Sequence, residues 1–545
     1  MNNKILAATL ALAALQAQAD IDTRAVPARP VASALPAHWQ QGVFMEVFVR
    51  AYQDSDGDGI GDLRGLTRRL DYLKSLGVSA LWLMPVTASA DHDHGYANTD
   101  FRAIEPQYGT LDDFDTLIRE AHRRGIGIVM DYVVNHASYQ FPPFQQALKD
   151  PSSPWRSWFV WNPDPGPGWD IWGKYPWYDA DTLPWTWTGE LKDLPRPKPG
   201  QPNVYFGTFG PHMPDFNLRN PVVWRYHEDS LRFWLNRGLD GFRLDAVPHM
   251  IENSAKDWND QPESRVLTKQ LQDLIKSYPG RYAVCEATAE PAAYGAPEVC
   301  GAAFAFNLQY EIMKAAQGDA AAVAKVSAYY AQMAPTMATF LHNHDSFAGQ
   351  RVWDQLKGDE ARYRLAAASY LLLPGTPFVY YGEEIGQAGS AGSGDDPLRS
   401  PMSWTASNRG AEGFSSGAPF RPLALNRSQH NAQSQQLQAD SLFHFYQRLI
   451  QLRRDSAALT RGRYEAAQVQ GQVWSFQRVQ GDERVLVAIN YGDEAATVSL
   501  QQLPPRARAV PSLPRQASPW QADTAGQATL ALPPLSVRVY RLLTR

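Results

Sequence analysis

Short apolar runs alternate with amphipathic helical patterns along most of this chain, and that alternation constrains its fold more than any other feature. Most of the runs are joined by segments with a helical pattern, such as residues 63–76 and 111–124. Apolar strands separated by helices are typical of a parallel sheet that helices cover. Eight such units predict an α/β fold, a (β/α)8 TIM barrel rather than an open, doubly wound sheet. The runs that we interpret as strands are residues 43–52, 80–85, 127–135, 239–247, 282–286, 302–307, 339–345 and 376–381.

One long connection interrupts this alternation. Between Asn135 and Asn217 the chain is rich in Pro and Gly and carries eight tryptophans. A structureless loop of that length is improbable in a compact domain, so we expect a folded insertion that acts as a lid. Because it follows the third strand, at the edge where barrel enzymes carry their active sites, it should form one wall of a cleft. The tryptophans are Trp155, Trp158, Trp161, Trp169, Trp172, Trp177, Trp185 and Trp187.

The pattern changes after Arg461. Short alternating runs, separated by Gly, Asp and Pro, predict a small antiparallel β-sandwich. We therefore expect five parts along the chain. They are a signal peptide (1–19), an Ala/Pro-rich segment without fixed structure (20–37), the barrel (38–135 and 216–460), the inserted domain (136–215) and the C-terminal β-sandwich (461–545).

The first residues have the layout of a secretory signal peptide. Lys4 supplies the positive charge, residues 5–15 are apolar, and Ala17-Gln-Ala19 is a small-residue cleavage site. No later run reaches the length of a transmembrane helix. We therefore expect an exported protein, periplasmic or extracellular, with no membrane anchor.

Composition and charge narrow the classes of molecule that this protein can bind. The formal net charge is −5 and no basic stripe occurs, which argues against a nucleic-acid partner. We expect a monomer. The two cysteines, Cys285 and Cys300, are compatible with one disulfide, but Cys285 lies in an apolar run where a buried free thiol is equally reasonable.

Charged side chains recur where the expected strands end. Arg243 and Asp245 lie two positions apart, so they share one face of the fourth strand, and the cation favours an ionised Asp245. Considered alone, this pair could be purely structural. In a barrel, however, the strand ends converge, and several ionisable groups on one rim are costly unless they have a function. Three carboxylates and one arginine around a cleft suit glycoside hydrolysis. The residues of this constellation are Asp131, Asn135, His136, Arg243, Asp245, Glu286, His344 and Asp345.

These segments resemble the conserved regions of the α-amylase superfamily, glycoside hydrolase family 13. The resemblance rests on Asp131-Tyr-Val-Val-Asn-His136, Gly241-Phe-Arg-Leu-Asp245, the strand that ends at Glu286, and Phe340-Leu-His-Asn-His-Asp345. It covers nearly all of the chain after the leader. Met213-Pro-Asp-Phe-Asn217 resembles a marker at the end of the inserted domain, intermediate between the oligo-1,6-glucosidase and neopullulanase groups. The chain as a whole is most similar to an exported bacterial α-amylase.

The resemblance implies a role for each member of the catalytic triad. Asp245 is implied as the nucleophile, Glu286 as the general acid and later base, and Asp345 as the residue that grips sugar hydroxyls in the transition state. The residues implied to bind substrate are Asp93, Tyr96, His136, Arg243, His249 and His344.

A second site is legible in the acidic loop after the first strand. Carboxylates recur at every second position, and glycines allow the chain to turn tightly, a pattern suited to a hard cation such as Ca²⁺. The alternative is a solvated acidic turn. The loop also resembles the structural metal loop of oligo-1,6-glucosidase-like enzymes. That likeness implies one Ca²⁺ held by Asp54, Asp56, Asp58, the carbonyl of Ile60, and Asp62.

The resemblance implies a retaining enzyme that cleaves internal α-1,4-glucosidic bonds of starch and maltooligosaccharides by double displacement. Ala246, where a Val would indicate α-1,6 preference, supports α-1,4 specificity. Asp93 matches the residue with which exo-acting glucosidases hold a terminal sugar. Their partner arginine follows the stabilising Asp closely, whereas Arg351 is displaced here, so we expect an open cleft.

Three alternatives to this activity stay open. An α-glucosidase is one. A glucanotransferase or trehalose synthase is another, because Asp245-Ala-Val-Pro248 is similar to trehalose synthases. The most remote is a non-catalytic carbohydrate-binding protein on the same scaffold.

Overall fold

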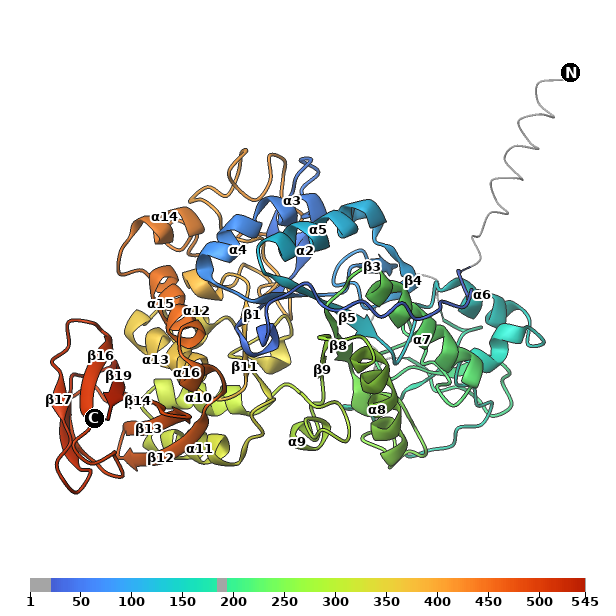
Figure 1. Cartoon of the computed structure of the whole chain (residues 1–545). Helices are drawn as coiled ribbons and strands as arrows, with labels where there is room; N and C mark the ends of the chain where they lie inside the picture. Colours follow the sequence, from blue (N-terminus) through green and yellow to red (C-terminus); the bar gives the residue numbers. More distant parts are fainter. Residues whose placement is uncertain (1–20, 184–193, 545) are drawn as a thin grey trace, which may run out of the picture.

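The computed structural model describes residues 21–183 and 194–544. The predicted signal peptide, Trp185 and Trp187 lie outside the described residues. A central parallel sheet is surrounded by helices, with the segment between β5 (Gly127–Val133) and α7 (Pro221–Asn236) on one side and the C-terminal strands on the other (Figure 1). No helix within those two ranges is both long enough and apolar enough to cross a bilayer.

Seven parallel strands form the central sheet, in the order β10-β11-β1-β2-β5-β8-β9. The predicted sixth strand is reduced to residues 303 and 304, where Ala303 bridges Cys285 of β9 and Phe304 bridges Ala338 of β10. These two bridges close the sheet into the predicted (β/α)8 barrel. The strands are β1 (Phe44–Val47), β2 (Ala80–Leu83), β5 (Gly127–Val133), β8 (Gly241–Asp245), β9 (Tyr282–Cys285), β10 (Ala338–Thr339) and β11 (Thr376–Tyr380).

Aromatic rings fill the interior of the barrel. Phe44 and Phe378, which are register partners on β1 and β11, lie 4.9 Å apart between ring centroids. Phe304 contacts both Phe378 (4.9 Å) and Trp82 (5.2 Å). All four side chains are almost fully buried, so the barrel is a packed core rather than a pore.

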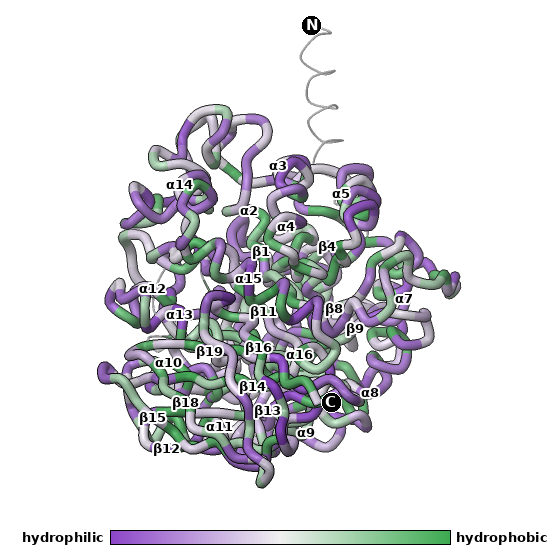
Figure 2. Tube along the Cα trace, turned by 60° about the vertical axis from the view of Figure 1, so that its left-hand side comes forward, coloured by the Kyte–Doolittle hydropathy of each residue, from purple (hydrophilic) through white to green (hydrophobic). Residues whose placement is uncertain are grey.

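Helices cover the outside of the barrel. Local sequence sets their ends: Thr110 and Asp113 form a capping box at the start of α5, and Gly77 ends α4 with φ of 98°, a backbone angle that favours glycine. Figure 2 shows apolar segments concentrated in the interior and hydrophilic ones outside. The covering helices are α3 (Leu63–Arg68), α4 (Leu70–Leu76), α5 (Leu111–Arg123), α7 (Pro221–Asn236), α8 (Pro262–Lys276), α10 (Leu308–Ala316), α11 (Ala320–Gln332), α13 (Glu360–Leu371), α15 (Leu442–Arg454) and α16 (Ala457–Arg461).

The prediction of a strand over residues 43–52 is wrong at its end. Val49–Tyr52 is the short helix α2, which turns the chain toward the acidic loop. All four residues are buried, so their apolar alternation indicated burial and did not distinguish strand from helix. Other short elements lie between barrel strands, namely β3 (Thr87–Ser89), β4 (Asn98–Ile104), α9 (Pro291–Tyr294) and α12 (Val352–Gln355), and α14 (Ala432–Leu437) follows the last of these strands.

The long connection after β5 is folded. It holds α6 (Pro142–Lys149), the 3-10 helix η3 (Pro154–Trp158) and an antiparallel pair, β6 (Trp177–Asp179) and β7 (Val204–Phe206). Its two ends are tied together at the barrel rim, where the Phe216 N–H donates to the Asn135 carbonyl (2.9 Å). Its small core consists of Trp169, Ile171, Trp177, Val204 and Phe206.

The C-terminal region is antiparallel, as predicted. A six-stranded sheet, β12-β13-β14-β19-β16-β17, packs with the pair β15-β18 through a shared apolar core. Arg478 of β13 joins this region to the barrel by donating to the Leu372 carbonyl (3.0 Å). The strands are β12 (Arg463–Gln470), β13 (Val473–Gln480), β14 (Glu483–Asn490), β15 (Ala496–Leu500), β16 (Arg508–Leu513), β17 (Trp520–Gln521), β18 (Ala528–Leu532) and β19 (Ser536–Leu543).

Candidate active site

The barrel brings the predicted catalytic residues to one rim. Asp131 of β5 is the register partner of Arg243 on β8, and Asp245 ends that strand. Glu286 follows β9, and its N–H donates to the Leu244 carbonyl of the neighbouring strand (3.0 Å). Asp131 and Glu286, which are 155 positions apart, therefore reach the same rim because parallel strands present their carboxyl ends on the same side.

Arg243 is the hub of this cluster. Its guanidinium is 1% exposed and contacts three carboxylates: Asp131 Oδ1 at 3.1 Å, Glu286 Oε2 at 3.0 Å, and Asp245 Oδ1. It also lies over the ring of Trp82, 5.1 Å from the centroid. The aromatic core of the barrel thus forms the floor beneath the charged site.

Burial raises the pKa of Asp245 well above its usual range. The guanidinium of Arg243 opposes this rise, whereas the negative charges of Glu286 and Asp131 add to it. The expectation that Arg243 alone keeps Asp245 ionised is therefore too simple, since one cation is shared among three carboxyl groups.

Asp345 lies in the opposite electrostatic environment. Burial alone would raise its pKa, but the His344 imidazole (3.1 Å) and the Arg399 guanidinium (3.0 Å) hold it well below the usual range. His344 also contacts Glu46 Oε1 at 2.6 Å. Burial lowers the pKa of His344, yet Asp345 and Glu46 raise it to about 10, so His344 is an imidazolium at neutral pH.

Glu46 and Arg399 were missed by the sequence reasoning. Glu46 sits inside the apolar run of β1 and is 2% exposed. A lone carboxylate in a buried strand was a readable signal, because such a group needs a buried partner. Arg399 lies in an irregular segment after β11, and no local pattern indicates that it reaches Asp345.

Ala246, directly after Asp245, was also overlooked as a positioning element. Its backbone has φ of 48°, unusual for a residue with a side chain, and its N–H donates to Glu286 Oε2 (3.1 Å). Strain of this kind is typical of functional sites. The residue after the predicted nucleophile therefore orients the predicted acid.

The predicted sugar-contacting residues surround this cluster. Tyr96 donates to Asp131 Oδ2 (2.9 Å) and stacks on His344 with ring centroids 5.6 Å apart. His136 donates one hydrogen bond from Nε2 to the Tyr96 carbonyl (3.2 Å). Burial lowers the pKa of His136 to about 3 and that of His249 to about 4, so both are neutral.

Asp93 does have an arginine partner. Its Oδ1 lies 2.9 Å from Arg421, which also contacts Asp396 (3.1 Å). Arg351 is instead buried and donates to backbone carbonyls, including that of Tyr381. Asp93 therefore has an arginine partner although Arg351 is displaced, because a residue far along the chain supplies the cation.

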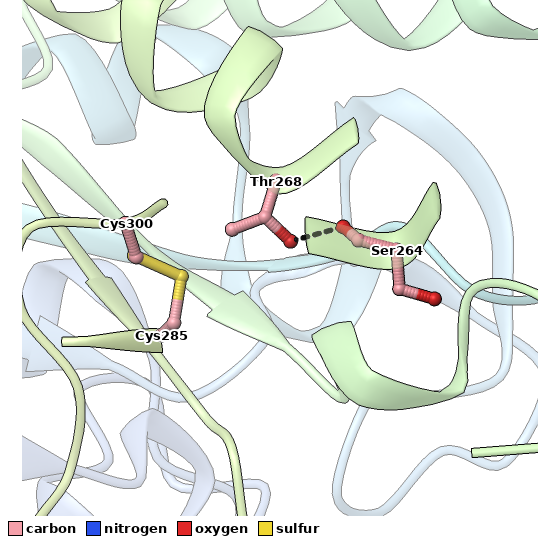
Figure 3. Close-up of a disulfide and its surroundings, with 4 residues drawn as sticks. All are labelled: Ser264, Thr268, Cys285 and Cys300. Atoms are coloured by element: carbon pink, nitrogen blue, oxygen red, sulfur yellow. Dashed lines mark hydrogen bonds between the residues drawn. A yellow bond between two sulfur atoms is a disulfide. The ribbon is translucent and has the colours of Figure 1, made fainter. Parts of the chain in front are cut away.

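The cysteines pair. Cys285 and Cys300 form a disulfide with S–S of 2.06 Å, and no free cysteine is present in the described residues. Figure 3 shows the bridge beside Ser264 and Thr268, where the Thr268 hydroxyl donates to the Ser264 carbonyl (2.7 Å). Because Cys285 immediately precedes Glu286, the bridge anchors the chain that follows the predicted acid.

The acidic loop gathers three of its predicted ligands. One oxygen from each of Asp54, Asp56 and Asp58 lies within 4.8 Å of the others, and none of them pairs with a cationic side chain in the described part of the chain. Asp62 lies outside this trio and accepts from Ser55 N (2.7 Å) and Gly65 N (2.8 Å), capping α3. Ile60 contributes its N–H to Asp58 (2.8 Å).

The loop is shaped for close approach. Gly59 has φ of 93°, and a Cβ there would meet the Ala418 carbonyl oxygen at 2.0 Å. Its N–H donates to Asp54 Oδ2 (2.9 Å). Three carboxylate oxygens gathered by backbone donors suit a hard divalent cation with oxygen ligands.

Comparison with known proteins agrees with this arrangement. The α-amylase catalytic domain matches residues 46–462. A trehalose synthase/amylase of Mycolicibacterium smegmatis is 38% identical over 431 residues, which cover 70% of this chain and 69% of the relative. Alpha-amylase 3 of Dictyoglomus thermophilum is 33% identical over 470 residues, covering 83% of this chain and 85% of the relative.

Solved structures have the same architecture. The crystal structure of an alpha-amylase from H. orenii superposes with a TM-score of 0.77 at 29% sequence identity. The match covers 92% of this chain and 99% of the other.

Proposed function

This chain belongs to the α-amylase family of glycoside hydrolases, and from that premise we propose that it cleaves internal α-1,4-glucosidic bonds of starch and maltooligosaccharides with retention of configuration. The family acts on α-glucan substrates. The single observation that carries the proposal is the cluster in which Arg243 contacts both Asp245 and Glu286. A nucleophile and an acid held by one guanidinium are the parts that double displacement needs.

The geometry suggests how the two steps proceed. Asp245 attacks the anomeric carbon while Glu286 protonates the leaving oxygen, which gives a glycosyl-enzyme and a free leaving sugar. Glu286, now a carboxylate, takes a proton from the incoming water, and attack by that water releases Asp245. Arg243 donates to Asp245 whenever its carboxylate is negative, and the ionised Asp345 balances the positive charge that develops on the sugar.

Product analysis with an Asp245→Asn variant tests this proposal. We expect the wild type to release mixed maltooligosaccharides from soluble starch, with α-anomers formed first. Asp245→Asn should lose at least about 10³-fold in kcat while keeping the same circular dichroism spectrum and melting temperature within a few degrees. Substantial residual hydrolysis by that variant would remove Asp245 from the nucleophile role.

The Asp93–Arg421 pair favours a second candidate, transfer or exo-type cleavage on short substrates such as maltose. A charged pair at the rim can hold the hydroxyls of a terminal sugar and limit how far a chain extends. A relative named trehalose synthase/amylase is consistent with this reading. Incubation with maltose separates the candidates, because trehalose would indicate transfer, whereas glucose alone would indicate hydrolysis.

We also propose that the acidic loop binds one Ca²⁺. Asp54, Asp56 and Asp58 would hold it, with the Ile60 carbonyl and Asp62 as further candidates. Because the loop packs on residues 413–420 through Gly59, the ion would brace two segments of the rim. Its role would be structural.

Export is the proposed route for this protein. The leader at residues 1–19 is one support, and the Cys285–Cys300 disulfide is another, because such bonds persist in oxidising compartments. Fractionation of cells that express the full chain tests this. The protein should appear in the periplasm or medium without its first residues.

A further inference from the structure

Trp172 stands out among the tryptophans because its ring is largely open to solvent. It is 56% exposed, and every other tryptophan within residues 21–183 and 194–544 is buried or half-buried. Its indole therefore presents an apolar face to solvent, and an indole combines that face with a polar N–H group.

The backbone at Trp172 adds to this anomaly. Ile171 and Lys174 exchange both backbone hydrogen bonds (2.8 and 3.0 Å), which makes Trp172 and Gly173 the tip of a two-residue turn. Both tip residues have positive φ, 53° and 81°. Such turns strongly prefer Asn, Asp or Gly at the first tip position, where Trp stands here. A bulky residue kept in this strained place indicates a use for its side chain.

Aromatic contacts hold the indole beside His249, one of the predicted substrate-binding residues. Trp172 lies edge-on to His249 (5.3 Å) and near Phe209 (5.7 Å), while His249 stacks on Trp258 with an interplanar angle of 9°. Phe209 in turn contacts His136 at 5.1 Å. The rings therefore form a continuous wall from His136, on the rim after β5, to Trp172.

His249 connects this aromatic wall to the strand that carries Asp245. It lies four residues after Asp245, in the 3-10 helix η5 (Val247–His249). Its side chain is 5% exposed, and its Nδ1 has no hydrogen-bond partner in the described residues. A sugar could bind both side chains at once. One of its hydroxyls would pair with the His249 nitrogen, and its apolar C–H face would stack on the exposed indole.

We propose that Trp172 is a stacking platform for the sugar on the leaving-group side of the scissile bond. It binds a glucose unit of a maltooligosaccharide as leaving group, and again as acceptor when transfer occurs. This inference rests on the proposed function. Through Trp172, the inserted domain would control how long the leaving or accepting sugar stays beside the glycosyl-enzyme.

Two substrates separate this role from general damage to the site. In α-glucosyl fluoride the leaving group is a fluoride ion, too small to reach Trp172, whereas maltotriose places a sugar there. We expect Trp172→Ala to keep kcat/KM for α-glucosyl fluoride within about twofold and to lose about tenfold for maltotriose, mostly through KM. Trp172→Phe should lose less. Leu437→Ala, which removes another exposed apolar side chain from α14, should change neither value.

A third variant separates the effect of losing the indole ring from the effect of relieving the backbone strain at residue 172. Trp172→Asn suits the left-handed backbone but lacks the indole, so it should lose as much maltotriose activity as Trp172→Ala. Equal losses on both substrates, no loss on either, or full maltotriose activity in Trp172→Asn would each overturn the platform. If the wild type consumes neither substrate, the proposed function itself fails, which is a separate result.

Discussion

Asp93 and Arg421 form an ion pair of 2.9 Å across 328 positions of sequence. Arg421 is 12% exposed and Asp93 29%, so the pair is partly shielded from water. It joins the turn between β3 and β4 to the irregular segment after β11, at the rim that carries the triad. The two residues are too far apart in the sequence for their contact to be predicted from it. We expect this contact to affect which lengths of substrate the site accepts.

Removing Arg421 should therefore change selectivity by chain length. We expect Arg421→Ala to lower kcat/KM for maltose about fivefold and to affect maltohexaose less, because a short substrate depends more on each rim contact. Initial rates on both sugars measure this. Arg463→Ala, which removes an exposed Arg–Glu pair on β12 of the C-terminal region, is the control. An equal effect on both sugars would count against a selectivity role.

Asp215 should make stability depend on pH. Burial raises its pKa to about 7, although Thr208 and Asn135 donate hydrogen bonds to it. A raised pKa means that the folded state binds a proton more tightly than the unfolded state. Its contribution is thus fully present below about pH 4 and is lost as pH rises toward 7.

Asp215→Asn should remove that dependence. The difference in unfolding free energy between variant and wild type should shift by about 3 kcal/mol in favour of the variant between pH 4 and pH 7.5. Urea titrations at several pH values measure it, with the exposed Asp482→Asn as control. A constant difference across this range would show that Asp215 does not titrate there.

Chelation should destabilise the protein if the acidic loop holds Ca²⁺. We expect EDTA to lower the melting temperature by several degrees and added Ca²⁺ to restore it, since a bound ion stabilises only the folded state. Asp56→Asn should abolish that response. Glu298→Gln, at another exposed carboxylate, should retain it. A wild type that is indifferent to both EDTA and Ca²⁺ would exclude a stabilising ion.

The Cys285–Cys300 bridge should contribute to stability more than to chemistry. It closes a loop of 15 residues, for which about 3 kcal/mol is typical. Glu286 is held independently by its bond to Leu244, so the Cys285→Ala/Cys300→Ala variant should keep kcat within a few-fold at 25 °C. Denaturant unfolding and initial rates measure the two effects. A collapse of kcat in a variant that remains folded would instead assign the bridge a positioning role.

Much of the architecture was legible in local patterns. Apolar runs separated by helical segments predicted eight barrel strands, because burial on both faces demands such runs. The catalytic cluster followed, since strand-end residues such as Asp245 and Glu286 converge once the barrel is assumed. The prediction of a strand was wrong for residues 49–52, because buried helices and buried strands are equally apolar over short lengths.

Sequence alone thus determined the fold class and the carboxylates of the rim, because strand periodicity and strand-end position are local properties of the chain. Only the tertiary structure decided which side chains contact one another. Asp93 with Arg421, Glu46 with His344, and Cys285 with Cys300 are contacts made through space by irregular segments or neighbouring strands. No period relates such residues along the chain, so their pairing emerges only when the packed barrel brings them within reach. The same is true of charge: burial and the neighbouring carboxylates of Glu286 and Asp131 raise the pKa of Asp245 against the opposing charge of Arg243, and the Arg–Asp spacing in the sequence reveals none of these contacts.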